Sequence, residues 1–314
     1  MKPSAAVRIL EPGFRGVFYE CDKVSAPCFL ILMGDDEKDL MNTSCARWLR
    51  DVHHCHALSI GIRQEEGGDT GLHGWPLEHI EAAVSWLNKR KITKTGIIGI
   101  SMQASLALTA ASLIPELSLV LALSPNDFVP WGFYQGKIKN SAHGEWPSGT
   151  SAFSWRGKEL PFQPAGLEKE AYWAMFCREK KKHHEIHTRS IFDYSETVHP
   201  VKEDCFIPVE AIQGKLILAG AEDDVMWDAG KYIRRMEQRL VEKKRSENCH
   251  IFLYPYGTHL LFPEKMIRKA LPFGGDLVSC MFRSGRKHRK ECKEARIDLE
   301  TRLSRAISDW KHSV

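Results

Sequence analysis

The sequence predicts an α/β fold in which a mostly parallel sheet carries helices on both faces. Short apolar runs alternate along the chain with longer segments whose apolar residues recur at helical spacing. One of these runs, residues 96–100, leads into Ser101, and an Ala/Leu-rich stretch of helical character follows at once. The 314 residues are 43% hydrophobic and 27% charged, which is ordinary for a globular protein. We expect a single α/β domain spanning residues 1–314.

The predicted strands and helices follow one another in the order that such a sheet requires. The continuously apolar run at residues 27–33 predicts a central strand buried on both faces. Strands are predicted at residues 6–10, 16–21, 27–33, 56–60, 96–100, 117–123, 215–219 and 250–254. Helices are predicted at residues 40–51, 77–87, 227–243 and 291–310, and another begins at Met102. Residues 208–214 are expected to lead the chain back into the sheet.

The regular alternation is interrupted between about residues 127 and 207. This segment is rich in Trp, Pro, Gly, Lys and His, and it has only short periodic pieces such as residues 169–179. Insertions in such sheets gather at the carboxyl ends of strands and often cover the site. We therefore expect a lid over Ser101. Its aromatic residues either line an apolar pocket or form the lid's own small core: Trp131, Phe133, Phe153, Trp155, Phe162 and Trp173.

The charge of the chain gives no indication of nucleic acid as a partner. The formal net charge is only +4, and the basic residues are spread along the sequence. Two basic runs, residues 178–184 and 283–290, are interpreted as solvated helix faces or loops, with an anionic ligand as the alternative. The apolar stretch at 96–124 is broken by Gly99, Pro115 and Glu116, so no membrane span is expected.

The cysteine pattern points to a reducing compartment. Nine cysteines are scattered without C-x-x-C pairs, so neither a disulfide framework nor a zinc site is predicted. The first residues lack the apolar core of a signal peptide, and we expect a cytoplasmic protein. The segment His53-His-Cys-His56 resembles a metal cluster, but its side chains would have to converge from a helix-to-strand junction. No metal and no cofactor are expected.

The motif Gly99-Ile-Ser-Met-Gln103 has the layout of a nucleophile elbow, in which a serine occupies a sharp turn between a strand and a helix. A side chain in place of Gly99 would collide with the folded backbone. The free N–H groups at the start of the helix would face the space above Ser101, where an oxyanion forms. The usual pattern is G-x-S-x-G, and Gln103 replaces the second glycine. The alternative is a serine that merely caps a buried helix.

A serine nucleophile needs a base and a carboxylate that orients the base, and the sequence supplies both. The strand at 215–219 leads into Gly220-Ala-Glu-Asp-Asp224, and the strand at 250–254 leads into Pro255-Tyr-Gly-Thr-His259. The order Ser, Asp, His is that of the α/β-hydrolase fold. His259 is predicted to accept the proton of Ser101, and Asp224 to hold the imidazole. Asp223 or Asp224 could instead begin the next helix, and His259 could be a structural loop residue.

Several segments together resemble the catalytic domain shared by acyl-CoA thioesterases and bile acid-CoA:amino acid N-acyltransferases. They are, in order, Gly99-Ile-Ser-Met-Gln103, Ser124-Pro-Asn126, Phe153-Ser-Trp-Arg-Gly-Lys-Glu-Leu-Pro161, Ile207-Pro-Val-Glu-Ala-Ile-Gln-Gly214, Gly220-Ala-Glu-Asp-Asp-Val-Met-Trp227 and Tyr254-Pro-Tyr-Gly-Thr-His259. The resemblance implies an α/β-hydrolase fold. Aligned on Trp227, it assigns the family's catalytic aspartate to Asp224. Members that hydrolyse acyl-CoA carry Ser as the nucleophile, and the transferase carries Cys, so Ser101 favours hydrolysis.

The expected reaction is the hydrolysis of an acyl-CoA thioester to the free acid and CoA. Backbone N–H groups of Met102 and of Gly34 or Asp35 would hold the oxyanion. Asp35-Asp36 stands where a glycine-rich loop is common, and a carboxylate there would oppose the developing negative charge. Other readings are a carboxylesterase, a dienelactone-hydrolase-like enzyme, a peptidase, an acyltransferase to an amine, or a degenerate hydrolase that only binds a ligand. The substrate is expected to be a small acyl-CoA or ester.

Overall fold

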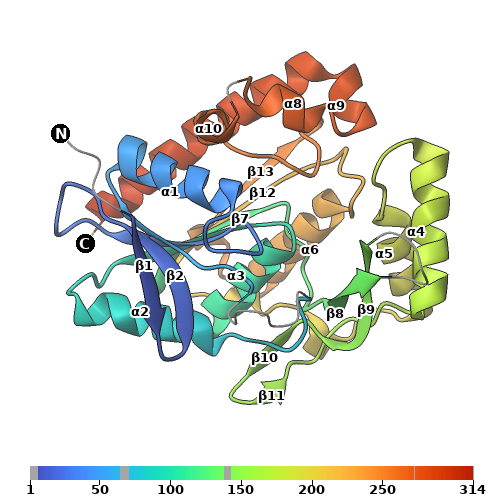
Figure 1. Cartoon of the computed structure of the whole chain (residues 1–314), viewed down its shortest axis with the longest axis horizontal. Coiled ribbons are helices and arrows are strands. Elements are labelled where there is room, and N and C mark those ends of the chain that lie inside the picture. Colours follow the sequence, from blue (N-terminus) through green and yellow to red (C-terminus); the bar gives the residue numbers. More distant parts are fainter. Residues whose placement is uncertain (1–5, 64–70, 138–142, 272, 314) are drawn as a thin grey trace.

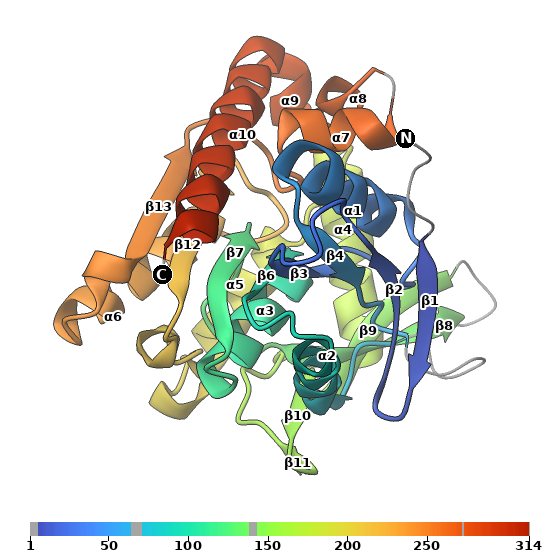
Figure 2. The same cartoon turned by 90° about the vertical axis from the view of Figure 1, so that its left-hand side faces the viewer.

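An eight-stranded sheet forms the centre of the molecule (Figures 1 and 2). The computed structural model describes residues 6–63, 71–137, 143–271 and 273–313. The strand order is β1-β2-β4-β3-β6-β7-β12-β13. These strands are β1 (Val7–Glu11), β2 (Phe14–Tyr19), β3 (Cys28–Leu32), β4 (His56–Ser59), β6 (Thr95–Ile100), β7 (Leu117–Leu123), β12 (Lys215–Ala221) and β13 (Cys249–Tyr254). Each predicted strand is therefore present, with ends within two residues of those expected.

The sheet is parallel except at one edge. β1 pairs antiparallel with β2, and β2 antiparallel with β4, whereas every pair from β4 to β13 is parallel. Every residue of β3 and β6 is buried, as expected for strands covered on both faces. In register, Ile100 lies beside Leu123, and Leu123 beside Ala219. The carboxyl ends of β6, β7 and β12 therefore meet at one edge, where loops from distant parts of the chain converge.

Helices cover both faces of the sheet and enclose two apolar cores. The helices are α1 (Leu40–His53), α2 (Glu78–Lys89), α3 (Met102–Leu113), α4 (Lys169–His183), α5 (Arg189–Val198), α6 (Ala229–Glu242), α7 (Glu264–Ala270), α8 (Gly275–Ser279), α9 (Arg283–Lys287) and α10 (Arg289–His312). One core packs α2, α3 and α6 against side chains such as Leu30 and Val120. The other packs α1, α7 and α10 against Phe29 and Leu121, from the opposite face of the same strands. Figure 2 shows α1 and α10 together on one side and α2 and α3 on the other.

The segment between β7 and β12 contains more regular structure than the sequence indicates. It holds β8 (Trp131–Lys137), β9 (His143–Ser151), β10 (Phe153–Trp155), β11 (Lys158–Glu159), α4 and α5, and residues 138–142 lie outside the described part. β8 and β9 form a hairpin, while β10 pairs with β11 and with the short β5 (Trp75–Pro76). Residues 208–214 do not enter the sheet: Val209–Ala211 is a single 3₁₀ turn, and the strand begins at Lys215.

The C-terminal part adds three short helices that the sequence analysis did not predict. α7, α8 and α9 lie between β13 and α10, which crosses the molecule beside α1 (Figure 1). Near the end of α10, Trp310 is 2% exposed and its ring packs edge-on against Phe29 of β3, with ring centroids 5.0 Å apart. None of the helices in the described residues is both long and apolar enough to cross a membrane.

Candidate active site

Ser101 lies on the sharp turn between β6 and α3. Its backbone is left-handed, with φ 60° and ψ −133°, and its N–H donates to the carbonyl of Leu123 in β7 at 2.9 Å. A left-handed φ is costly for a residue other than glycine and persists only where the surroundings impose it. A Cβ on Gly99 would come within 2.2 Å of the carbonyl oxygen of Gln103, so only glycine fits there. The Ser101 side chain makes no capping hydrogen bond to the helix, which contradicts the capping alternative.

Three side chains from separate loops form a continuous hydrogen-bonded chain. The Ser101 Oγ lies 2.7 Å from Nε2 of His259, and Nδ1 of His259 lies 2.7 Å from Oδ2 of Asp224. His259 is 3% exposed and Asp224 is fully buried. Because Asp224 is positioned to accept from Nδ1, Nε2 is left free to accept the serine proton. The structure thus brings together the three residues singled out in the sequence.

The neighbouring carboxylate, Asp223, makes different contacts. Its Oδ1 accepts from the backbone N–H groups of Gly257 and Thr258 at 2.9 and 2.8 Å, and its Oδ2 accepts from the hydroxyl of Ser284. Asp223 therefore anchors the loop that carries His259 and does not contact the imidazole. Neither aspartate begins the next helix, since α6 starts at Ala229 and the side chain of Asp228 caps it by accepting from Lys231 N–H at 3.0 Å.

Trp227 and Ser124 enclose the histidine. The Trp227 ring stands perpendicular to the His259 ring at 4.8 Å, and its Nε1 donates to the Ser124 carbonyl at 3.2 Å. The Ser124 hydroxyl donates in turn to the carbonyl of His259 at 2.8 Å. Oδ1 of Asp224 accepts from the N–H groups of Met226 and Trp227 at 2.8 and 3.4 Å. These contacts fix the imidazole and leave its carboxylate partner little freedom to move.

The loop after β3, predicted to complete an oxyanion site, is held by Gln103. The side-chain Nε2 of Gln103 donates to the carbonyl of Gly34 at 3.1 Å. In a trans peptide the C=O and the following N–H point in opposite directions, so the N–H of Asp35 points away from this contact. At the base of the loop, Asn42 accepts from Met33 N–H at 3.0 Å and donates to the Asp36 carbonyl at 2.8 Å. Gln103 thus adds a hydrogen bond to this loop.

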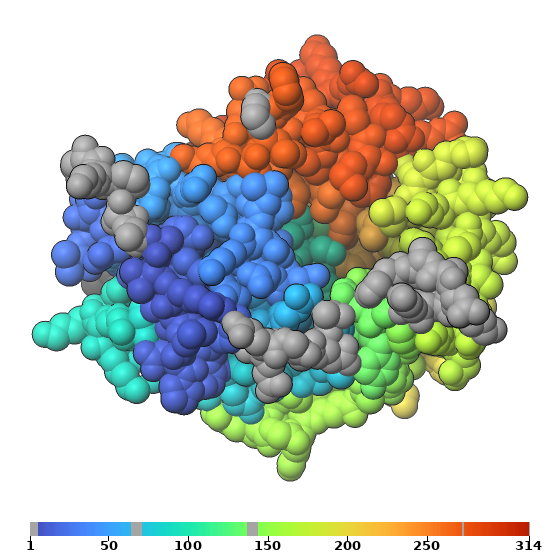
Figure 3. Space-filling view, in the orientation of Figure 1, coloured from blue at the N-terminus to red at the C-terminus, as the bar shows by residue number. Residues whose placement is uncertain are grey.

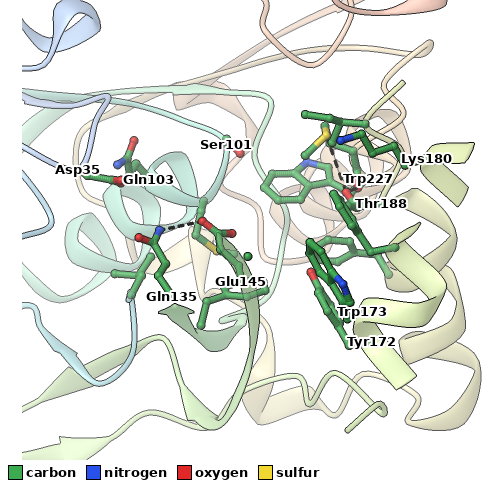
Figure 4. A pocket seen from close by; sticks show the side chains of 18 of the residues that line it. Asp35, Ser101, Gln103, Gln135, Glu145, Tyr172, Trp173, Lys180, Thr188 and Trp227 are labelled. Carbon is green, nitrogen blue, oxygen red and sulfur yellow. Dashed lines mark hydrogen bonds between the residues drawn. The ribbon is translucent and has the colours of Figure 1, made fainter. Parts of the chain in front are cut away.

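A cavity of about 650 Å³ opens onto Ser101 (Figure 4). One end is polar and acidic, where Gln135 donates to Glu145 at 2.8 Å and where Asp35 and Gln103 also lie. The other end is largely aromatic, with Tyr172, Trp173 and Trp227 labelled in Figure 4 and with Lys180 at its margin. In the space-filling view the surface is hollowed between the yellow-green segment that carries α4 and the orange segment that carries α8 and α9 (Figure 3).

The two carboxyl groups in this cavity influence each other. Surrounding protein raises the pKa of Glu145, and the charge of Asp35 raises it further. The pKa of Asp35 is raised by burial and by the charge of Asp39, although Arg63 partly offsets this. A higher pKa keeps each carboxyl protonated to a higher pH than usual. The conflict between Asp35 and an oxyanion is therefore weaker than an ordinary aspartate would cause.

The aromatic residues of the 127–207 segment divide between cavity and core. Phe133 and Trp173 line the cavity. Trp131 is 1% exposed and stacks on Phe192, with ring centroids 4.7 Å apart. Phe153 is fully buried, while Trp155 and Phe162 pack against the same apolar core. Each of the two readings of this set therefore holds for part of it.

The remaining candidates from the sequence are dispersed. The two basic runs lie side by side, because the N–H of Arg283 donates to the Glu185 carboxylate just beyond the first run, and Lys180 of that run lines the cavity. His56 accepts from the N–H of Cys21 at 3.1 Å and forms no metal-binding cluster with His53 and Cys55 among the described residues. All nine cysteines are free thiols.

Sequence reasoning missed Glu145, Tyr172 and the anchoring role of Asp223. Glu145 comes from β9 and Tyr172 from α4, in the segment where no regular pattern was visible. The helical spacing at residues 169–179 was the available signal for Tyr172. No sequence signal marks Glu145.

The family model described as BAAT / Acyl-CoA thioester hydrolase C terminal matches residues 75–266, more than half of the chain. No curated protein matches the sequence. Among solved structures, the esterase Pf2001 of Pyrococcus furiosus is 12% identical with a TM-score of 0.54, and the match covers 98% of this chain and 91% of that one. Carboxyl esterase 2 of Tuber melanosporum is 11% identical with a TM-score of 0.55, covering 99% and 88%. Esterase LipW of Mycobacterium marinum is 13% identical with a TM-score of 0.51, covering 98% and 82%.

Proposed function

Because the chain belongs to the family BAAT / Acyl-CoA thioester hydrolase C terminal and has the α/β-hydrolase fold, we propose that it hydrolyses acyl-CoA thioesters with Ser101 as the nucleophile. Family and fold are those of hydrolases that act on ester bonds. The observation that carries the proposal is the hydrogen-bonded chain from Asp224 through His259 to Ser101, which opens into a cavity with an aromatic end.

In the proposed first step, Ser101 Oγ attacks the thioester carbonyl carbon while Nε2 of His259 takes the hydroxyl proton. The carbonyl electron pair moves onto oxygen, and the N–H groups of Met102 and of Gly34 or Asp35 stabilise that charge. When the pair returns, the C–S bond breaks and CoA leaves as the thiolate or, after taking the proton from His259, as the thiol. The product is an acyl ester of Ser101.

In the second step water replaces the thiol. Nε2 of His259 takes a proton from water as its oxygen attacks the acyl carbon, and the C–O bond to Ser101 breaks. The proton then passes to Ser101 Oγ, and the free acid leaves. The buried Asp224 stabilises the positive imidazolium in both steps. An oxygen ester of serine is attacked by amines less readily than a thioester is, so Ser101 favours water as the acceptor.

We assign to the segment at residues 127–207 the role of a lid. Its residues Phe133, Tyr172 and Trp173 supply much of the wall opposite Ser101, and apolar walls of this kind suit an acyl chain. Nine free cysteines suit a reducing compartment such as the cytoplasm.

The experiment measures free-thiol release from acyl-CoAs of increasing chain length by the wild type and by Ser101→Ala. We expect release by the wild type and a loss of at least about 10³-fold in kcat in the variant. Ser112→Ala, a serine on the same helix that does not line the cavity, is the matched control and should retain activity. Equal release by wild type and Ser101→Ala would refute the assignment of the nucleophile.

A second candidate, hydrolysis of an oxygen ester, is favoured by the acidic end of the cavity. Asp35 and Glu145 would repel the phosphates of CoA, whereas a neutral or cationic ester is not penalised. Turnover of p-nitrophenyl esters without thiol release from any acyl-CoA would establish this candidate. Transfer to an added amine would appear as an amide product. Absence of turnover together with no labelling of Ser101 by a fluorophosphonate would instead indicate a binding protein.

A further inference from the structure

Three side chains at the end of α4 form a cluster that the hydrolase mechanism does not use. Glu179 and His183 are four residues apart on the last turns of α4, and His187 lies in the loop before α5. One ligand atom from each lies within 4.8 Å of the other two. Nε2 of His183 is 3.4 Å from Oε2 of Glu179, and the His183 and His187 rings stack with centroids 4.0 Å apart.

The donor set and the spacing suit a zinc ion. Zinc in proteins is bound by imidazole nitrogen and carboxylate oxygen at about 2.0–2.2 Å in tetrahedral geometry, which separates two ligand atoms by about 3.3 Å. The Glu179 to His183 distance has this value. Two histidines and a glutamate leave a fourth position for water.

Two features indicate that the cluster lacks a strong partner. Nδ1 of His187 is buried and has no hydrogen-bond partner among the described residues, a state that costs free energy unless the nitrogen is bound. Glu179 is 8% exposed, and its other contacts are with Arg178 at 3.2 Å and Lys182 at 4.0 Å, both of which are mostly exposed. Ion pairs of that kind contribute little, so a metal ion could replace them at small cost.

The cluster adjoins the wall of the cavity. Lys180, Ile186 and Thr188 line the cavity and alternate along the chain with the three clustered residues. Thr188 is anchored to the loop after Asp224, since its N–H donates to the Val225 carbonyl at 3.1 Å and its hydroxyl to the Met226 carbonyl at 2.6 Å. An ion that joins α4 to His187 would therefore fix the end of α4 against this anchored loop.

We propose that Glu179, His183 and His187 bind a divalent transition-metal ion, with Zn²⁺ as the ion that the donor set favours, and that the ion holds the α4 side of the cavity in place. Metal binding does not depend on the proposed hydrolase activity. The effect on the cavity does rest on it, because that effect is read through catalysis.

The test titrates Zn²⁺ into the full chain, stripped with a chelator, in competition with a chromophoric chelator. We expect the wild type to bind one equivalent and His183→Ala or His187→Ala to lose about 100-fold or more in affinity. His184→Ala is the matched control, because this exposed histidine next to His183 is outside the cluster and should bind as the wild type does. Co²⁺ should give the visible absorption of a four-coordinate site in the wild type and control alone.

Two further readouts separate the parts of the proposal. Zn²⁺ should raise the melting temperature of the wild type and His184→Ala but not of His187→Ala, whose melting temperature in chelator should match the wild type. Unchanged Zn²⁺ affinity in His183→Ala and His187→Ala would overturn the site. If Zn²⁺ binds there, it should change KM more than kcat, because the wall residues touch the cavity and not the reacting atoms. Equal KM with and without Zn²⁺ would overturn the link to the cavity.

Discussion

Asp223 and Asp224 are adjacent in sequence but belong to different contacts in the site. Asp224 is fully buried against Nδ1 of His259, and Asp223 holds the backbone at Gly257 and Thr258. A carboxylate that orients an imidazole acts on its tautomer and charge, whereas one that accepts from backbone N–H groups acts on the position of a loop. The two substitutions to asparagine should therefore have unequal effects.

Asp224→Asn should lower kcat by about 10³–10⁴-fold, because an amide at this place favours the wrong imidazole tautomer. Asp223→Asn should lower kcat/KM by about tenfold, since the amide oxygen still accepts from the loop but carries no charge. Steady-state kinetics of both variants on one substrate make the comparison. A larger loss in Asp223→Asn would assign the triad carboxylate to the wrong residue.

Asp35→Asn should give a pH-dependent gain in kcat/KM for acyl-CoA. Because the pKa of Asp35 is raised, its carboxyl is neutral at low pH and becomes negative as the pH rises through that value. The variant should match the wild type at low pH and exceed it at higher pH, by about two- to fivefold, because water in the cavity screens part of the charge.

The control for this experiment is Asp36→Asn, since Asp36 does not line the cavity. The measurement is the ratio of kcat/KM between variant and wild type across the pH range in which both are folded. A ratio that stays constant with pH, or that falls as the pH rises, would contradict a repulsive role for Asp35.

At the residue scale the sequence predicted what depends on local geometry. Gly99, Ser101 and His259 could be assigned because a strand, a turn and a characteristic loop lie within a few residues of each. The division of roles between Asp223 and Asp224 could not be read from the residues themselves, because both follow the same strand. It depends on which of them meets a loop 35 residues away. Only the resemblance favoured Asp224 in advance.

At the scale of secondary structure, the parallel strands were predictable and the elements of the insertion were not. β3 and β6 are continuous apolar runs, which any buried strand needs. β8 and β9 contain Gly132, Gly136, Gly144 and Pro147 and lack alternating apolar residues. They form because each pairs with the other across a hairpin, and β10 forms against β5 from far earlier in the chain. Such pairing leaves little trace in local sequence.

The insertion is joined to the main domain by an ion pair at its start. Both carboxylate oxygens of Asp127, which is 2% exposed, accept from Arg235 of α6 at 2.6 Å. Arg235 also donates to Glu196 of α5 at 2.8 Å, so one guanidinium connects two parts of the insertion to α6.

Arg235→Met should lower the free energy of unfolding by about 3 kcal/mol, because it leaves the Asp127 carboxylate buried without a partner. Urea denaturation followed by circular dichroism measures the change. The double variant Asp127→Asn with Arg235→Met removes the unpaired charge and should recover part of the loss. A double variant less stable than Arg235→Met alone would refute this account.

At the scale of the whole molecule, α10 closes one face of the sheet. Trp310 packs against Phe29 in the middle of the strand order, and its Nε1 donates to the Ser118 hydroxyl of β7 at 3.0 Å. Residues near the end of the chain thereby cover strands formed by its first third. The sequence predicted α10 as a helix, but its position depends on contacts that no local pattern encodes.

Trp310→Ala should lower the free energy of unfolding by about 3–5 kcal/mol through the cavity it creates. Trp310→Phe keeps most of the ring and loses the hydrogen bond to Ser118, so it should cost about 1 kcal/mol for that bond plus a smaller packing loss. Differential scanning calorimetry of the two variants tests this order, and an equal loss in both would show that packing is not the main contribution.

The parallel strand order also sets when the site comes into existence. Asp224 and His259 are separated by one strand–helix–strand unit, whereas Ser101 lies 158 residues before His259 and reaches it only across paired β6, β7 and β12. Contacts between distant parts of a chain form late, because the loop entropy must be paid before they are made. A newly synthesised chain that has built β6, α3 and β7 already presents its serine, yet that serine remains inert until the strand before His259 has docked. Premature reaction during biosynthesis is thus prevented by the topology itself.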